Sequence, residues 1–251
     1  MRVTRFRVTL SNPLAGAGSQ VFWLVKTPLL VEEGAGQGAA VQCWGAELGG
    51  ERCYAGAQMS QEPTPEPIKE LVSACLEYVK RSLGTELDFT PETLPLLDHY
   101  LTEVREELEG KPELAELTAH AAGAYFGEVL RRQMKGFWRT PSASLHDFQI
   151  CSSVAFVSIN PFGVAYDALY GSTEHGGPRS NLKLAPEDHG YIAARLATVP
   201  EVPEEQFYLL TTRIEVVEIT VEALRARLEE QGYSETEYTP EDYEAELRYL
   251  N

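Results

Sequence analysis

The sequence predicts an α+β fold in which an antiparallel β-sheet packs against a layer of helices. The first sixty residues alternate polar and apolar positions in short runs between turn residues, as antiparallel strands do. Residues 66–135 and 203–231 instead repeat apolar residues every three or four positions, which is typical of helices with one buried face. A further β-rich run at 148–159 indicates that strands and helices occupy separate stretches of the chain.

The opening segment, residues 1–60, is expected to form a β-meander. Strands are expected over residues 2–10 and near 21–25, 40–45 and 52–59. Two glycines between the last two strands suit a tight hairpin turn, because glycine tolerates positive φ. The segment at 61–67 contains three prolines and is expected to be a stiff connector to the helices.

The next segment, residues 66–135, is expected to contain three helices. The first carries an apolar stripe and ends at Gly84, a residue that suits a left-handed helix cap. The second begins at Thr90-Pro91-Glu92, where a capping hydroxyl, a proline and an acid all favour a helix start. The third follows a turn at Gly110-Lys111-Pro112.

This third helix, over about 112–135, is predicted to be the buried centre of the fold. Its sequence is almost wholly apolar around one charged residue, Glu128. Ala119, Gly123 and Gly127 recur every four positions and therefore share one helical face. Such a face allows a neighbouring backbone to approach closely.

The second half of the chain mixes short elements and then gives one long helix. Residues 148–200 are expected to contain a strand or hairpin, a turn at 160–163, a short helix, a loop at 171–181 and another short helix. A helix over about 203–231 repeats its apolar residues at 3-4 spacing from 207 to 228, which fits a core-facing stripe and a coiled-coil seam equally well. Residues 1–231 are expected to form one domain, followed by an acidic, tyrosine-rich tail at 232–251.

Charge is the strongest feature of the composition. The net charge is −17, and residues 201–251 hold 14 acidic and 4 basic residues. Such a surface repels nucleic acid and anionic lipid and favours a basic protein partner. No apolar run is long enough to span a bilayer, and the alternating first ten residues predict a strand instead of a secretion signal. The expected location is the cytoplasm.

Glu128 is the first candidate for chemistry. As a buried carboxylate it is a possible general acid or base, together with His120 or His146. The competing interpretation is structural, because a glutamate followed by Arg131 and Arg132 usually pairs with one of them. The five histidines are scattered, and the four cysteines form no C-x-x-C pair. We therefore predict no metal site and no cofactor.

Two further segments carry weaker signals. Residues 144–147, Ser-Leu-His-Asp, contain the letters of a catalytic triad, but neighbours on a strand would point to opposite faces. Residues 176–179, Gly-Gly-Pro-Arg, suit either a plain surface loop or an anion contact.

Three segments resemble a family of uncharacterised bacterial proteins of the myxobacterial and actinobacterial type. They read GAYFGEVLRR followed by FWR, then INPFGVAYDAL, then PEEQFYLLTTRIEVVEITVEAL. The resemblance covers roughly residues 86–230. It implies an intracellular α+β protein, and it implies no activity and no catalytic residue. Some acidic proteins of this kind are encoded beside toxins or secretion systems.

The sequence favours a non-enzymatic protein that binds a basic protein partner through an acidic surface, as an immunity or accessory factor. One alternative is a small-molecule hydrolase that uses Glu128 with His120 or His146. The other is a subunit that self-assembles through the 207–228 stripe into a homo-oligomer. The expected contact residues of the binding protein lie in the tail: Glu235, Glu237, Tyr238, Glu241, Asp242, Tyr243 and Glu244.

Overall fold

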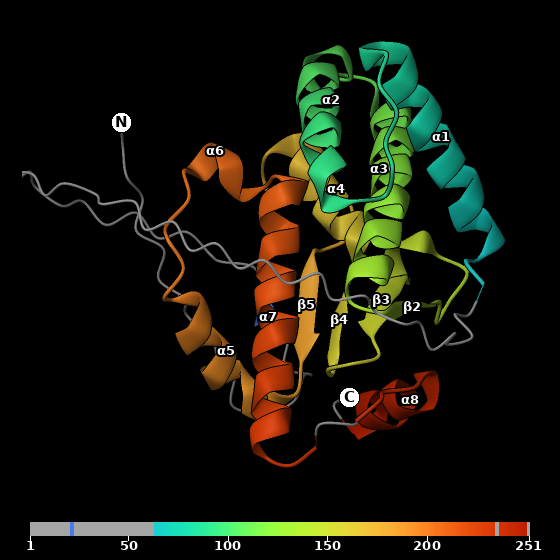
Figure 1. Cartoon of the computed structure of the whole chain (residues 1–251). Coiled ribbons are helices and arrows are strands. Elements are labelled where there is room, and N and C mark those ends of the chain that lie inside the picture. Colours follow the sequence, from blue (N-terminus) through green and yellow to red (C-terminus); the bar gives the residue numbers. More distant parts are fainter. Residues whose placement is uncertain (1–20, 23–62, 234–235, 250–251) are drawn as a thin grey trace, which may run out of the picture.

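The computed structural model describes residues 21–22, 63–233 and 236–249 of the 251-residue chain. Apart from the two residues at 21–22, the predicted meander over 1–60 lies outside the described residues. Within them the fold is α+β, as predicted: helices surround an antiparallel sheet (Figure 1).

The sheet has five strands in the order β1-β5-β4-β3-β2, and every neighbouring pair is antiparallel. The strands are β1 (Val21–Phe22), β2 (Gly136–Arg139), β3 (Gln149–Ser152), β4 (Val157–Ile159) and β5 (Asn181–Leu184). The predicted β-rich run at 148–159 is therefore a hairpin of β3 and β4. β2 and β5 were not predicted, because each has only four residues and follows directly on a helix or a loop.

Eight α-helices accompany the sheet among the described residues, and α2 and α5 each continue directly from a short 3₁₀ helix. They are α1 (Glu66–Leu83), α2 (Leu94–Glu107), α3 (Pro112–Gln133), α4 (Pro161–Tyr170), α5 (His189–Leu196), α6 (Glu204–Phe207), α7 (Leu210–Glu230) and α8 (Pro240–Tyr249). The 3₁₀ helices are η1 (Pro91–Thr93), η2 (Leu145–Asp147) and η3 (Pro186–Asp188). The helix predicted to end at Gly84 does so, with that glycine at φ 68°.

The two faces of the sheet have separate cores. Along β2 and β3 the side chains alternate, so that Trp138 and Ile150 join the large core with the helices. Phe137 and Cys151 point to the other face, where they pack with Tyr243 of α8. In Figure 1, α8 accordingly lies apart from the other helices, below the sheet.

α3 is the central helix, as predicted, and residues 121–131 are buried without interruption. Its small-residue face lies against α4 and β2. A Cβ added to Gly123 would lie 2.8 Å from the Cα of Phe162, and one added to Gly127 would lie 2.3 Å from the Trp138 ring. Both distances are too short for real contacts, so the predicted close approach is confirmed.

The predicted long helix at 203–231 is wrong in one respect: α6 and α7 are separate helices. Leu209 between them is extended, at φ −64° and ψ 144°. Asp98 of α2 accepts hydrogen bonds from the N–H groups of Leu210 and Thr211 at 2.7 and 3.1 Å. The carboxylate thus caps the first turn of α7 and fixes where that helix begins.

The apolar stripe of α7 faces the core. Most of its members are buried within this one chain, against α2, α4 and α5. These side chains are already covered, so they leave little apolar surface for the self-association seam that we predicted along 207–228. The buried members on α7 are Leu210, Ile214, Val217, Val221 and Leu224, and Phe207 on α6 is buried as well.

We expect Gly123→Ala to lower the free energy of unfolding by about 1–3 kcal/mol, because the added methyl meets the backbone of α4. Gly190→Ala in α5 is the matched control, since nothing lies within 4 Å of its added Cβ. It should raise stability by about 0.5–1 kcal/mol, as alanine generally does for a helical glycine. Urea denaturation of both variants measures the difference, and equal effects would contradict the close packing of α3 on α4.

Candidate functional site

Glu128 on α3 is held by three hydrogen-bond donors in the core. Its carboxylate accepts from Trp138 Nε1 at 2.8 Å and from Thr64 Oγ1 at 3.0 Å. Arg131, one turn along α3, donates from Nε at 3.1 Å and from Nη2 at 3.0 Å. The predicted pairing with an arginine is therefore confirmed for Arg131, whereas Arg132 lies over the Phe89 ring at 3.9 Å.

This environment does not suit general acid or base catalysis. Burial by itself raises the pKa of Glu128, but the hydrogen bonds from Arg131, Trp138 and Thr64 hold it below its ordinary value. Only 5% of the residue is exposed. A carboxylate that stays ionised and enclosed neither donates a proton near neutral pH nor reaches a substrate. The hydrolase alternative thus loses its principal residue.

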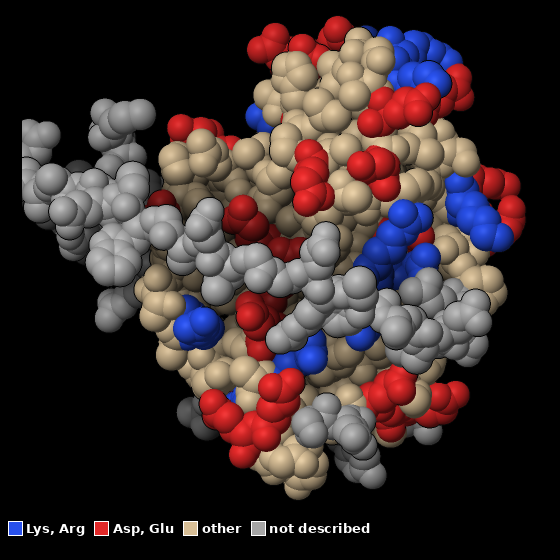
Figure 2. Space-filling view, viewed as in Figure 1, with Lys and Arg blue, Asp and Glu red and all other residues tan. Residues whose placement is uncertain are grey.

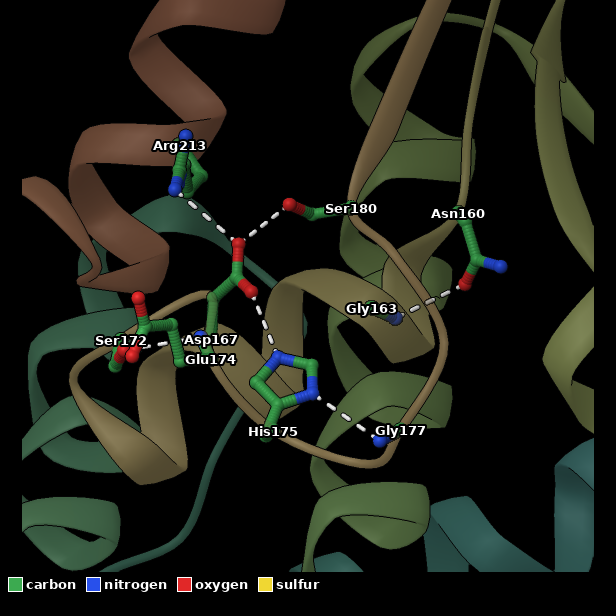
Figure 3. Close-up of polar contacts among 9 residues, drawn as sticks. All are labelled: Asn160, Gly163, Asp167, Ser172, Glu174, His175, Gly177, Ser180 and Arg213. Atoms are coloured by element: carbon green, nitrogen blue, oxygen red, sulfur yellow. Dashed lines mark hydrogen bonds and ion pairs between the residues drawn. The ribbon is translucent and has the colours of Figure 1, made fainter. Parts of the chain in front are cut away.

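A second buried carboxylate, Asp167 on α4, ties three segments together (Figure 3). It accepts hydrogen bonds from the hydroxyl of Ser180 and from His175 Nε2, the latter at 2.9 Å. Arg213 of α7 lies 3.3 Å from the same carboxylate. The side chains of Asp167, His175 and Arg213 are each at most 3% exposed.

The Asp167 network contains a serine, a histidine and an aspartate but is not a nucleophilic triad. Ser180 bonds to the aspartate instead of the histidine. The other ring nitrogen of His175, Nδ1, accepts from the Gly177 N–H at 3.2 Å, which assigns the proton to Nε2. Neither nitrogen is available to activate a hydroxyl. The network fastens the 171–181 loop to α4 and α7. The Gly177 N–H donates to His175 within this loop and is therefore not free to bind an anion.

Histidines gather around Tyr166 of α4. The ring centroids of His175, His120 and His146 lie 5.3, 5.8 and 6.3 Å from that of Tyr166. Glu116 lies one turn before His120 on α3. Glu116, His120 and His146 each offer a ligand atom, and these three atoms lie within 4.8 Å of one another. We call these three residues the histidine–glutamate cluster.

The segment that carries His146 is fixed by its backbone. The His146 N–H donates to Ser144 Oγ at 3.3 Å, and its carbonyl accepts from the side chain of Asn160, which caps α4. The residues at 144–147 therefore form a 3₁₀ turn and not the strand that we expected. His99 of α2 pairs with Glu103 at 3.3 Å.

This cluster was not predicted from the sequence. Glu116 and His120 are four residues apart, a spacing that by itself indicates only a shared helical face. His146 is 26 positions further on and reaches them only because β2 leads the chain back along α3. Nothing in the spacing of these three residues could have indicated their contact.

A hollow of about 500 Å³ lies where η3, the end of α7 and the start of α8 meet. Among its described lining residues are four carboxylates, Glu187, Asp188, Glu237 and Asp242, and one guanidinium, that of Arg227. Arg227 is bound to Asp188 at 2.5 Å. Burial raises the pKa of Asp188, and the charge of Arg227 opposes that shift. We call this feature the acidic hollow.

The predicted contact residues have different positions in the structure. Glu237, Tyr238 and Asp242 line the acidic hollow. Glu241 is exposed, Glu244 pairs with Arg139 at 2.8 Å, and Glu235 lies outside the described residues.

Tyr243 was predicted wrongly as an anchor for a partner. The residue is 0% exposed. Its hydroxyl lies within 3.0 Å of the carbonyls of Ser152, Ala155 and Val157, and it accepts from the Val157 N–H at 2.9 Å. The predicted separate tail therefore contains a helix, α8, that completes the second core of the sheet.

Comparison of the chain with protein-family models, with curated proteins and with solved structures finds no match. The resemblance to uncharacterised bacterial proteins therefore stays a prediction. In the part of the chain that the structure describes, no helix combines the length and the apolarity needed to cross a bilayer.

We expect Glu128→Gln to lower the free energy of unfolding at pH 7 by about 3 kcal/mol, because the buried Arg131 then loses its ion pair with Glu128. A carboxylate with a depressed pKa stabilises the fold above pH 4.5, its ordinary pKa, and that contribution is lost as the pH falls through the folded-state value. The difference between wild type and variant should therefore shrink in acid. Urea denaturation at several pH values measures it.

Glu103→Gln is the control for this measurement, because Glu103 and its partner His99 are both at least half exposed. It should change stability by about 0.5 kcal/mol or less at every pH. A pH-independent effect of Glu128→Gln would contradict the assignment of an ionised, arginine-bound carboxylate.

Proposed function

We propose that this protein binds a basic protein partner and that the acidic hollow receives a lysine or arginine side chain of that partner. The observation that carries the proposal is the lining of the hollow, in which four carboxylates face one guanidinium. This proposal keeps the expected class of function, a non-enzymatic immunity or accessory factor, and moves its contact site from the whole tail to one concave surface.

The carboxylates of the hollow differ in how much of their charge is free for a partner. Asp188 is neutralised by Arg227. Asp242 accepts from the Thr239 N–H at 2.8 Å and from its hydroxyl at 2.9 Å, so it also caps α8. Glu187 and Glu237 are exposed. These two glutamates are therefore the best candidates for direct contact with a cation.

An aromatic wall completes the chemistry of the hollow. Phe156 and Tyr238 both line it, with ring centroids 5.9 Å apart. Aromatic faces attract guanidinium and ammonium groups, and they also cover the methylene stems of arginine and lysine. A hollow that combines carboxylates with aromatic rings thus suits a long cationic side chain.

The surrounding surface supports the same class of partner. Acidic side chains gather around the lower end of α7 and beside α8 (Figure 2). Exposed charges of one sign speed the encounter with an oppositely charged partner and repel nucleic acid.

We expect the full chain to bind a short arginine-rich peptide, and a peptide of equal length with glutamine in place of arginine to bind far more weakly. The double variant Glu187→Gln/Glu237→Gln should weaken binding about tenfold, since each exposed charge contributes modestly. Raising the salt from about 0.05 to about 0.5 M shortens the Debye length roughly threefold and should weaken binding further. Isothermal titration calorimetry measures all three effects.

The control is Glu103→Gln/Glu113→Gln, which removes the same charge from exposed positions on α2 and α3. If it weakens binding as much as the double variant of the hollow, the interaction depends on net charge alone and the proposed site is wrong. Point variants are preferable to removal of the tail, because Tyr243 holds α8 to the sheet and truncation would disturb the fold.

A further inference from the structure

We propose that Glu116, His120 and His146 form a binding site for one divalent transition-metal ion. Their ligand atoms lie within 4.8 Å of one another, although they come from α3 and from η2. Two imidazoles and one carboxylate are a ligand set that suits zinc and its neighbours in the first transition row. None of these residues lines the acidic hollow, so the site is independent of the proposed function.

The geometry requires only a small adjustment. Metal–ligand bonds of about 2.0–2.2 Å place neighbouring ligand atoms roughly 3–3.5 Å apart. The cluster is therefore within about 1–2 Å of a closed site. Glu116 is exposed and has three rotatable side-chain bonds, so it can supply most of this movement.

The environment of His120 is an independent indication. Its Nε2 atom is enclosed and has no hydrogen-bond partner among the described residues. Buried polar atoms are nearly always hydrogen-bonded, so an enclosed nitrogen without a partner among the described residues is a candidate ligand atom. The edges of Phe162 and Tyr166 border the ring, with centroids 5.8 Å away in both cases. These rings support the imidazole without satisfying its nitrogen.

His146 is held ready by its surroundings. Ser144 and Asn160 each form a hydrogen bond with its backbone. The centroid of its ring lies 5.6 Å from the centroid of the His120 ring. A ligand positioned by its own backbone loses little conformational freedom on binding a metal. The Asn160 side chain also caps α4, so the position of His146 is tied to the helix that carries Tyr166.

Three protein ligands leave at least one coordination position of the ion for water or a small ligand. Glu116 is exposed, whereas His120 is half-buried. A bound ion would join η2 to α3 and would therefore also stabilise the connection between β2 and β3.

The test uses the full chain after treatment with a chelator. We expect one Zn²⁺ per chain by isothermal titration calorimetry. Co²⁺ at the same site should give visible d–d absorption of the intensity typical of four- or five-coordinate ions. His120→Ala and His146→Ala should each weaken Zn²⁺ binding about 100-fold, and Glu116→Gln about tenfold.

His99→Ala is the matched control, because His99 and Glu103 also form a glutamate–histidine pair four residues apart on a helix, with no third ligand described beside them. It should leave binding unchanged. Circular dichroism of each metal-free variant verifies that it is folded, and His146→Ala on the short η2 turn keeps the test valid if His120→Ala disturbs the core.

Three results would overturn the site. The first is the absence of Zn²⁺ binding by the folded wild type, and the second is binding that persists unchanged in both His146→Ala and Glu116→Gln. The third is equal weakening by His99→Ala, which would indicate nonspecific surface association.

Discussion

The close contact of α3 with α4 and β2 is the constraint on which the rest of the structure depends. Gly123 and Gly127 let the backbone of α4 and the ring of Trp138 approach α3 to distances that no side chain would allow. Because α3 is then buried from 121 to 131, its charged residues must be satisfied within the protein. Glu128 and Arg131 satisfy each other, and Trp138 adds a third partner. The position of α4 in turn places Asp167 for the loop network and Tyr166 among the histidines.

Much of the helical layer could be predicted because its signals are local. Gly84 ends α1, the sequence at 90–92 begins the second helical segment, and small residues at every fourth position indicate a buried face on α3. These features depend on residues at most four positions apart, so a single sequence reveals them. The two short strands β2 and β5 lack any such signal.

The parts that could not be predicted all depend on residues far apart in the chain. The start of α7 is set by Asp98, and the burial of Tyr243 by carbonyls about ninety residues earlier. The histidine–glutamate cluster likewise joins residues that precede β2 in the chain to His146, which follows it. Sequence periodicity indicates which face of an element is apolar, but it does not indicate which polar group of another element will lie opposite. For the same reason the sequence predicts a free binding surface in the tail, whereas Tyr243 of α8 packs against the sheet.

The net charge of the chain therefore overstates how many carboxylates are available to bind a partner. Asp98, Glu128 and Asp167 are buried and serve as helix cap, ion-pair partner and loop anchor. Asp242 caps α8, and Glu244 is paired with Arg139. Each of these carboxylates contributes to the formal charge of −17 but stabilises the fold instead of attracting a partner. The formal charge therefore does not by itself locate a contact surface.

The capping of α7 by Asp98 has a consequence for how the chain folds. The acceptor and the amide groups that it binds are 112 residues apart, with α3, the sheet strands β2 to β5 and α4 between them. Until α2 has docked, the leading amides of α7 have only water as a partner, and no local residue replaces the carboxylate. Closing so large a loop is slow compared with forming a helix turn. We therefore expect the first turn of α7 to acquire protection from hydrogen exchange only after the centre of the protein has assembled, later than the remainder of the same helix.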